Sequence, residues 1–159
     1  PYAKTKLMAE NLLINHYQHK SWILRFAPIY SDDFRLNIKR RTFFLKTPFT
    51  VSKGIYRLSL CNIKNIKDLA ISILANKVSP NIYNISDSNP YSYLELQEVN
   101  KNANCINIPK VFMKVIFFLG HLFKNKFFIE NSIKLVSDNI YPSNKIRSQV
   151  ALNHILEEV

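Results

Sequence analysis

The sequence predicts an α/β fold in which short buried strands alternate with helices. Apolar side chains recur at helical spacing over residues 2–19, and the apolar run from Trp22 to Phe26 that follows is typical of a buried strand. A strand and then a helix recur over residues 57–77, and residues 81–85 are a further strand candidate. This alternation builds βαβ units, in which ligands bind at the carboxyl ends of the parallel strands.

Turn-forming residues divide the first half of the chain. Ala27-Pro28 ends the first strand, so residues 27–33 are expected to form the loop on the ligand side of the sheet. Residues 37–45 predict a basic helix, and residues 48–54 predict a turn with a short extended piece.

The second half begins with the strand over residues 57–61. A helix with an apolar stripe is expected from residue 65 to about residue 77, with Asn65 as its N-cap. After the strand at residues 81–85, the segment Ser92-Tyr93-Leu94-Glu95 is a capping box that predicts the start of another helix.

An apolar helix is expected after Pro109, carrying the side chains from Val111 to Phe123. Its apolar core is shorter than the roughly 20 residues that a membrane span requires, and Lys114 and His121 interrupt it. We therefore expect a buried helix and no transmembrane segment, with a peripheral membrane contact as the alternative. A generic helical ending is expected over residues 148–159.

The composition fits one domain or part of a larger one, since 159 residues that are 47% hydrophobic can bury a sizeable core. The net charge of +11 favours anionic partners: nucleic acid, a membrane surface or phosphorylated small molecules. Basic residues are scattered apart from Lys39-Arg40-Arg41, so we expect no nucleic-acid binding. Cys61 and Cys105, with no signal peptide in view, indicate a reduced, cytoplasmic protein.

Two histidines, His16 and His19, have a spacing that occurs in metal sites. No neighbouring Cys, Asp or Glu completes a ligand set around them. We expect surface histidines and no metal.

Tyr2 and Lys6 are four residues apart and fall on one face of the first helix. A tyrosine with a pKa near ~10 is a poor base at neutral pH, but a neighbouring cation favours the phenolate. The pair is therefore a candidate for proton chemistry, and the alternative is an ordinary solvated contact on a helix.

The segment from Pro1 to Glu10, with the run Trp22-Ile23-Leu24-Arg25-Phe26-Ala27-Pro28-Ile29-Tyr30, resembles the second half of the NAD-dependent epimerase/dehydratase family. These are extended short-chain dehydrogenases/reductases that include UDP-glucose 4-epimerase. The resemblance implies the C-terminal part of a Rossmann-like doubly wound parallel sheet plus a small mixed α/β substrate lobe. Residues 1–33 would end the dinucleotide-binding domain with the catalytic helix. Residues 34–159 would mix the substrate lobe with the last Rossmann-like elements.

The resemblance also implies roles for five residues. Tyr2 would be the catalytic acid/base, and Lys6 would hold the nicotinamide ribose and lower the pKa of Tyr2. Pro28 would line the nicotinamide. Asn37 and Arg57 would bind the nucleotide-sugar substrate, with Arg57 on the diphosphate, since a guanidinium pairs bidentately with phosphate oxygens.

Gly54 and Gly120 are the only glycines, so no Gly-rich phosphate-binding turn is present in these residues. We expect a C-terminal fragment whose parent uses NAD, with NADP left open, and forms a homodimer through the helix of Tyr2 and Lys6. The fragment alone is expected to be inactive. The alternatives are a nucleotide-sugar reductase or dehydratase of the same fold, and a noncatalytic basic binding module or degenerate fragment.

Overall fold

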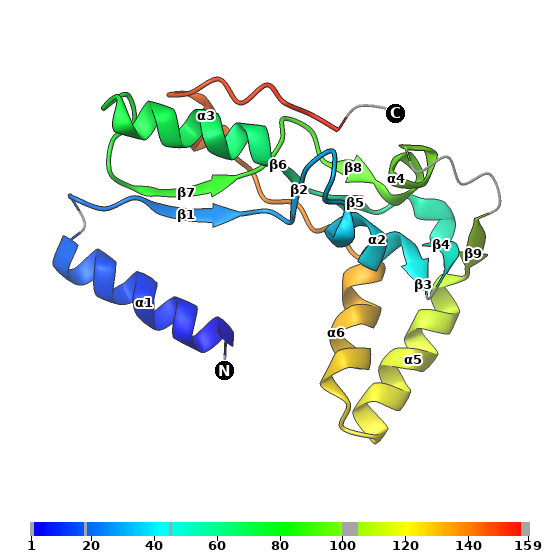
Figure 1. Ribbon diagram of the computed structural model, residues 1–159. Helices are drawn as coiled ribbons and strands as arrows, with labels where there is room; N and C mark the ends of the chain where they lie inside the picture. Colours follow the sequence, from blue (N-terminus) through cyan, green and yellow to red (C-terminus); the bar gives the residue numbers. More distant parts are fainter. Residues whose placement is uncertain (1, 18, 45, 100–104, 157–159) are drawn as a thin grey trace.

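The computed structural model describes residues 2–17, 19–44, 46–99 and 105–156 of the chain (Figure 1). Its helices are α1 (Tyr2–Tyr17), α2 (Leu36–Thr42), α3 (Ile63–Leu74), α4 (Tyr93–Val99), α5 (Lys110–Leu122), α6 (Lys126–Leu135) and α7 (Asn144–Arg147), with the 3-10 turn η1 (Ser52–Gly54). Its strands are β1 (Ile23–Phe26), β2 (Ile29–Tyr30), β3 (Phe43–Phe44), β4 (Thr47–Val51), β5 (Arg57–Leu58), β6 (Cys61–Asn62), β7 (Ile82–Ile85), β8 (Tyr91–Ser92) and β9 (Ile106–Ile108).

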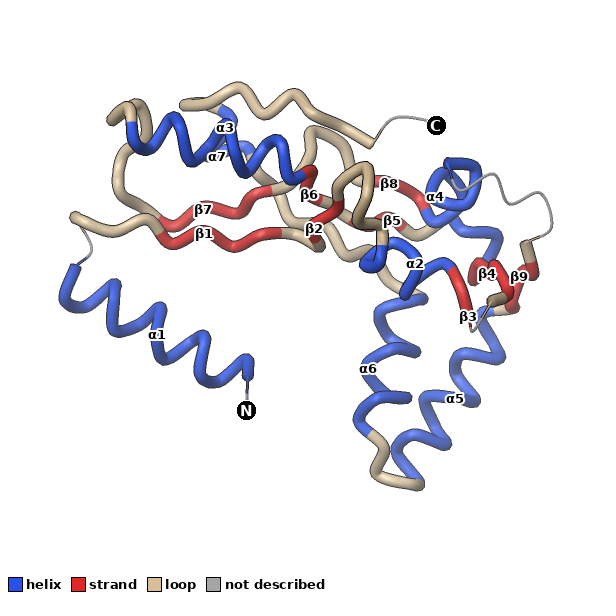
Figure 2. The backbone as a smooth tube through the Cα atoms, in the orientation of Figure 1, coloured by secondary structure: helices blue, strands red, loops and turns tan. Residues whose placement is uncertain are grey.

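The parallel pair β1–β7 is the centre of the α/β architecture. Its register runs from Ile23 opposite Ile82 to Phe26 opposite Ile85. Helices α1 and α3 lie on opposite sides of this pair (Figures 1 and 2). The α/β prediction and both strand predictions are therefore confirmed. The division of the chain at residue 33 stays a prediction.

The loop predicted over residues 27–33 contains a strand, β2, and that prediction was wrong in this respect. Ile29 and Tyr30 pair in parallel with Cys61 and Asn62 of β6, and the amide of Cys61 donates to the carbonyl of Pro28 at 3.1 Å. The single strand predicted over residues 57–61 is likewise two strands, because β5 pairs antiparallel with β8 whereas β6 pairs with β2.

The helix predicted over residues 37–45 is shorter than expected, because the chain turns into a hairpin after Thr42. Phe43 and Phe44 form β3 and pair antiparallel with the start of β4. The rest of β4 pairs in parallel with β9, which the sequence did not predict.

The turn η1 follows β4, and Gly54 in it has a φ of +72°. A Cβ built on Gly54 would lie 2.7 Å from the backbone nitrogen of Leu94 in α4. Glycine is therefore required here by the backbone conformation and by the close approach of α4.

Helix α3 begins two residues earlier than predicted, and Asn62 rather than Asn65 is its N-cap. The Asn62 side chain accepts a hydrogen bond from the amide of Lys64 at 2.9 Å. The capping box before α4 is confirmed: the Ser92 amide donates to the Glu95 carboxylate at 2.6 Å, and the Glu95 amide donates to the Ser92 hydroxyl at 3.1 Å.

Two clusters of buried side chains form the core. The first lies between β1, β7, α3 and α7 and consists of Ala27, Cys61, Leu69, Val78, Tyr83, Ile85, Ile146 and Leu152. The second lies between β2, α2, β5 and α4 and consists of Tyr30, Ile38, Leu58, Leu60, Tyr93, Leu96 and Leu156.

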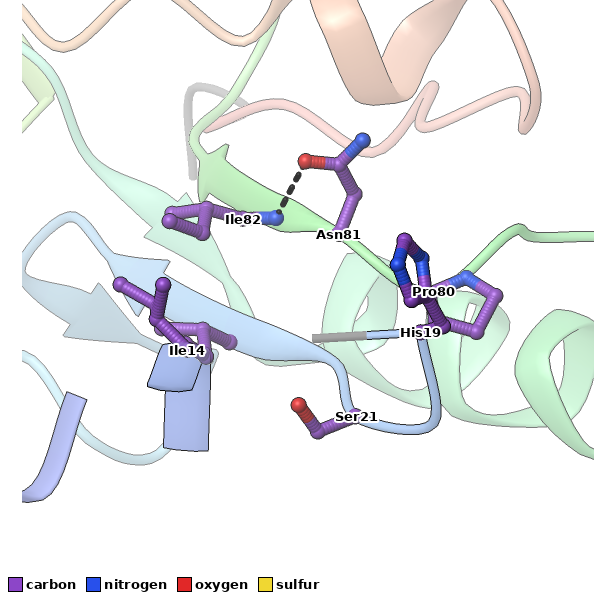
Figure 3. Close-up of a pocket in the computed structure, with 7 residues that line it drawn as sticks. Ile14, His19, Ser21, Pro80, Asn81 and Ile82 are labelled. Carbon is purple, nitrogen blue, oxygen red and sulfur yellow. Dashed lines mark hydrogen bonds between the residues drawn. The ribbon is translucent and has the colours of Figure 1, made fainter. Parts of the chain in front are cut away.

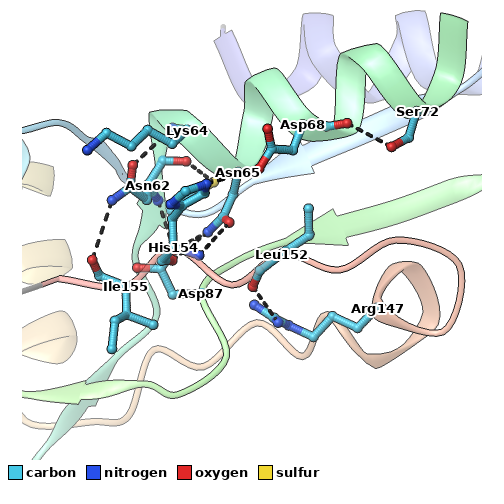
Figure 4. A network of polar contacts seen from close by, with 11 residues as sticks. Asn62, Lys64, Asn65, Asp68, Ser72, Asp87, Arg147, Leu152, His154 and Ile155 are labelled. Atoms are coloured by element: carbon cyan, nitrogen blue, oxygen red, sulfur yellow. Dashed lines mark hydrogen bonds and ion pairs between the residues drawn. The ribbon is translucent and has the colours of Figure 1, made fainter.

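The helical ending predicted for residues 148–159 was wrong for the described residues 151–156, which are not helical and run beside α3 (Figure 1). Asn65 explains this path. Its amide nitrogen donates to the carbonyl of His154 at 2.7 Å, and its amide oxygen accepts from the His154 backbone at 3.0 Å (Figure 4). Leu152 and Leu156 are consequently buried, one in each core cluster.

The prediction that α5 is buried was also wrong. Helices α5 and α6 form an antiparallel hairpin that projects from the sheet (Figures 1 and 2). Met113 and Gly120 of α5 are buried, whereas most of its apolar side chains are exposed. Within the described part of the chain, no helix combines the length and apolarity needed to cross a bilayer.

Candidate functional site

Helix α1 carries the Tyr2 and Lys6 pair. The helix begins at Tyr2, whose side chain lies outside the described part of the structure, and the α-helical conformation confirms the i,i+4 relationship of the two positions. The side chain of Lys6 is exposed. Among residues 3–17, only Glu10 and Ile14 are half-buried, so α1 touches the rest of the protein over a narrow strip.

An ion pair joins this helix to the end of β1. The Glu10 carboxylate accepts hydrogen bonds from Nε of Arg25 at 3.1 and 3.2 Å and from Nη2. Hydrogen bonding to Arg25 holds the pKa of Glu10 below its ordinary value, and the charge of Lys6 adds to this effect. The same pair raises the pKa of Arg25. Glu10 thus orients the helix that carries Lys6.

Lys6 lines an open cavity of about 570 Å³ between α1 and the β1–β7 pair. Glu10, Arg25, Phe26, Asn84 and Tyr141 contribute to its walls. This cavity lies along β1 and β7, on the side of the pair that faces α1.

A second cavity, of about 240 Å³, brings together two of the predicted site residues. Pro28 follows β1, and Asn37 belongs to the first turn of α2; both line this cavity. The side-chain amide of Asn37 donates to the carbonyl of Ile29 at 2.8 Å, which fixes its orientation against the strand.

Three cations also line the second cavity: Arg40 and Arg41 of α2, and Lys134 of α6. None of the residues that line it is acidic, although Lys134 pairs with Glu130 one turn before it at 3.3 Å. Convergent cations suit phosphate oxygens, and arginine can bind them bidentately. Lys39-Arg40-Arg41 is the one basic block in the sequence. The sequence did not predict that Lys134 of α6 lies at the same cavity as Arg40 and Arg41.

Arg57 lies elsewhere. Its backbone amide in β5 donates to the Asp138 carboxylate at 2.8 Å, and its carbonyl accepts from Asn139 at 2.8 Å. Arg57 is exposed and lines neither the cavity of Lys6 nor that of Asn37. The structure therefore brings Pro28 and Asn37 together without Arg57.

His19 lines a third cavity, of about 190 Å³, between the end of α1 and the start of the β1–β7 pair (Figure 3). Ile14, Ser21 and Asn81 are among its other walls. In the described part of the chain, no group of His, Cys, Asp and Glu side chains could hold a metal ion.

Asp87 is the buried polar centre beside these cavities (Figure 4). Its carboxylate accepts hydrogen bonds from the hydroxyls of Tyr30 and Tyr91 at 2.8 and 2.9 Å. It also accepts from the Asn62 backbone at 2.8 Å and the Asn65 side chain at 2.9 Å. Burial raises the pKa of Asp87 and raises the pKa of Tyr91 to about 12. These four bonds link Asp87 to β2, β6, α3 and β8, so the carboxylate holds these elements together.

Sequence comparison finds no protein-family profile and no curated protein that matches this chain. Structure comparison does find matches. A short-chain dehydrogenase/reductase superfamily protein of Agrobacterium tumefaciens, solved with bound NAD, is 13% identical; the match covers 99% of this chain and 54% of that protein, with a TM-score of 0.58. The ADP-L-glycero-D-manno-heptose-6-epimerase of Helicobacter pylori is 15% identical; the match covers 68% of this chain and 39% of the epimerase, with a TM-score of 0.52.

In fold, the chain is similar to both of these proteins. The chain spans 54% of the length of the superfamily protein and 39% of the length of the epimerase. The fold class and the structural resemblance to such proteins are thereby confirmed.

A nicotinamide cofactor of the superfamily fits these residues only in part. The sequence resemblance places the nicotinamide end at Lys6 and Pro28, but these two residues line separate cavities. The pyrophosphate end needs a glycine-rich turn at a helix N-terminus. Gly54 instead packs under α4 and Gly120 lies within α5, so these residues offer no such turn.

Proposed function

We propose that the chain is the C-terminal part of an NAD-dependent epimerase/dehydratase that acts on a nucleotide-linked sugar. Tyr2 removes a proton from a sugar hydroxyl, and Lys6 holds the nicotinamide ribose and favours the phenolate of Tyr2. NAD, when bound, would accept a hydride from the sugar and return it. NADP is the alternative cofactor. The pyrophosphate-binding turn belongs to residues outside this chain, so the chain alone is inactive.

One observation carries the proposal: the match with the NAD-bound superfamily protein extends over 99% of this chain. It is supported by the helical placement of Tyr2 and Lys6 at the start of α1 and by the cavity that Lys6 lines beside β1. The free thiols of Cys61 and Cys105 agree with a cytoplasmic enzyme.

The cavity that Asn37 lines is the proposed substrate site, and Pro28, which also lines it, is proposed to contact the nicotinamide. Asn37 holds the nucleotide, and Arg40, Arg41 and Lys134 neutralise the diphosphate. Arg57 stays a proposed contact to the diphosphate, although it does not line this cavity.

Helix α1 also offers a surface for a second copy. Leu7, Met8, Leu12 and Tyr17 are exposed on it, and apolar side chains exposed together on one helix favour a helical partner. We therefore include a homodimer through α1 in the proposal.

Calorimetry with UDP-glucose tests the substrate site on the 159-residue chain. Arg40→Ala removes an exposed cation from the cavity without touching the core, and we expect it to weaken binding about tenfold. Lys67→Ala, which removes an exposed cation from α3, is the matched control and should bind normally. Equal binding by wild type and Arg40→Ala would place the nucleotide-sugar elsewhere.

The catalytic part requires a longer version that includes the residues encoded upstream of Pro1. Tyr2→Phe in that version should abolish epimerase or dehydratase turnover of UDP-, GDP- or dTDP-sugars while calorimetric NAD binding remains. Full turnover by Tyr2→Phe would remove the proposed mechanism. Lack of NAD binding by the longer version would favour the noncatalytic alternative.

A further inference from the structure

The hairpin of α5 and α6 has an unusually apolar outer surface. Met113 and Gly120 face α6, where a Cβ on Gly120 would lie 3.0 Å from Cγ1 of Ile129. The opposite face of α5 is apolar as well and is exposed through Val111, Phe112, Val115, Phe118 and Leu122. Apolar side chains that are exposed together over one face of a helix are normally covered, so this surface needs a partner that the chain itself does not supply.

The tip of the hairpin alternates aromatic rings with cations. Phe123 is 72% exposed and Phe127 is 70% exposed, and the exposed residues Lys124 and Lys126 lie between them. Six of the eleven phenylalanines of the chain belong to residues 110–135. The concentration of phenyl rings on one projecting hairpin distinguishes this surface from scattered exposed side chains.

The hairpin is also basic. Residues 110–135 contain five lysines and one glutamate, Glu130, which pairs with Lys134. Among the described residues, no carboxylate forms an ion pair with Lys114, Lys124 or Lys126. The partner should therefore be both apolar and anionic.

We propose that the α5–α6 hairpin docks on the surface of a membrane that contains anionic lipids. The phenyl rings of the tip enter the boundary between headgroups and acyl chains, and the lysines beside them reach the lipid phosphates. A helix of 13 residues is about 20 Å long, shorter than the roughly 30 Å apolar layer of a bilayer. The hairpin therefore lies in the interface and does not cross the membrane.

The lysines favour a membrane over a protein partner. A second copy or another chain that covered Phe123 and Phe127 would also bury Lys124 and Lys126, and lysine is depleted at the centres of protein interfaces because its charge must be desolvated. At a lipid headgroup layer the same ammonium groups stay solvated beside phosphates, so apolar burial and charge attraction act together.

The test is co-sedimentation of the 159-residue chain with vesicles of phosphatidylcholine alone, or of phosphatidylcholine mixed equally with phosphatidylserine. We expect binding to the mixed vesicles, weakened by added salt, and little binding to phosphatidylcholine alone. Phe123→Ser and the double change Lys124→Glu with Lys126→Glu should each weaken binding about tenfold or more. Phe44→Ser is the matched control, because Phe44 is 70% exposed but lies in β3, away from the hairpin.

The outcomes separate the possible partners. Loss of binding in the hairpin variants but not in Phe44→Ser supports the proposal. Equal binding to both vesicle types, or unchanged binding by the hairpin variants, overturns it. A wild-type dimer in size-exclusion chromatography that Phe123→Ser converts to monomer, without any vesicle binding, also overturns it and assigns the surface to a second copy. Equal binding of the wild type to both vesicle types overturns the proposal even if a variant fails to fold.

Discussion

Glu10 of α1 and Arg25 of β1 form a paired contact in which one carboxylate accepts hydrogen bonds from two nitrogens of one guanidinium. This contact fixes the rotation of α1 against the sheet, since the remaining described side chains of α1 are exposed except Ile14. The helix that carries Lys6 is thus oriented chiefly by one polar pair and one apolar side chain.

Glu10→Gln should loosen α1 without unfolding the protein. An exposed ion pair contributes about 0.5–1 kcal/mol, so we expect amides of residues 3–17 to exchange about threefold faster in hydrogen-exchange mass spectrometry. Glu98→Gln replaces an exposed carboxylate on α4 and should leave this exchange unchanged. Unaltered exchange in Glu10→Gln would show that the other contacts of α1, Ile14 among them, hold the helix.

The attachment of α1 should also depend on pH. Because Arg25 lowers the pKa of Glu10 in the folded protein, the ion pair contributes fully above the ordinary pKa of about 4.5. Its contribution is lost as the pH falls through the lowered folded value. The nitrogen chemical shift of the Arg25 Nε, followed during acidification, should change in this window in the wild type and stay nearly constant in Glu10→Gln.

Asn65→Ala should release the C-terminal segment. Asn65 is fully buried, and the substitution removes both of its bonds to the backbone of His154 and its bond to Asp87. Each unsatisfied buried group costs about 1–3 kcal/mol. We therefore expect the free energy of unfolding, measured by urea titration, to be about 2–4 kcal/mol lower than in the wild type. Asn11→Ala, on the exposed face of α1, should change stability by less than about 0.5 kcal/mol. Equal effects of the two variants would contradict this role of Asn65.

Gly54→Ala should destabilise the protein by about 2 kcal/mol or more. The alanine would have to adopt a φ of +72°, and its methyl group would collide with the backbone of Leu94, which cannot rotate away. Ser88→Ala, at an exposed turn position, is the control for thermal unfolding. A melting temperature for Gly54→Ala equal to that of wild type would mean that η1 can move away from α4.

Features encoded by neighbouring residues could be predicted from the sequence. The strands β1 and β7 follow from short segments rich in apolar side chains, and the start of α4 follows from Ser92 and Glu95, which lie within one helical turn. The short strands β2 and β9 could not be predicted, because they exist only through pairing with β6 and β4, which are distant in sequence.

The missed parts of the site have the same cause. Arg40 and Lys134 lie far apart in the sequence, and only the packing of α6 beside α2 brings them to one cavity. Asparagine is a residue type favoured at helix N-caps, but the tertiary contacts of Asn65 with His154 and Asp87 give it another role. The exposure of α5 also depends on what surrounds the helix, which its own apolar pattern does not reveal.

The two glycines described above set how closely the elements on either side of them can pack. Each stands where an added methyl group would meet other atoms of the folded protein at 3.0 Å or less, Gly54 under α4 and Gly120 against α6. Any side chain at these positions would have to push two elements apart. The spacing of η1 from α4, and of α5 from α6, therefore depends on residues that have no side chain.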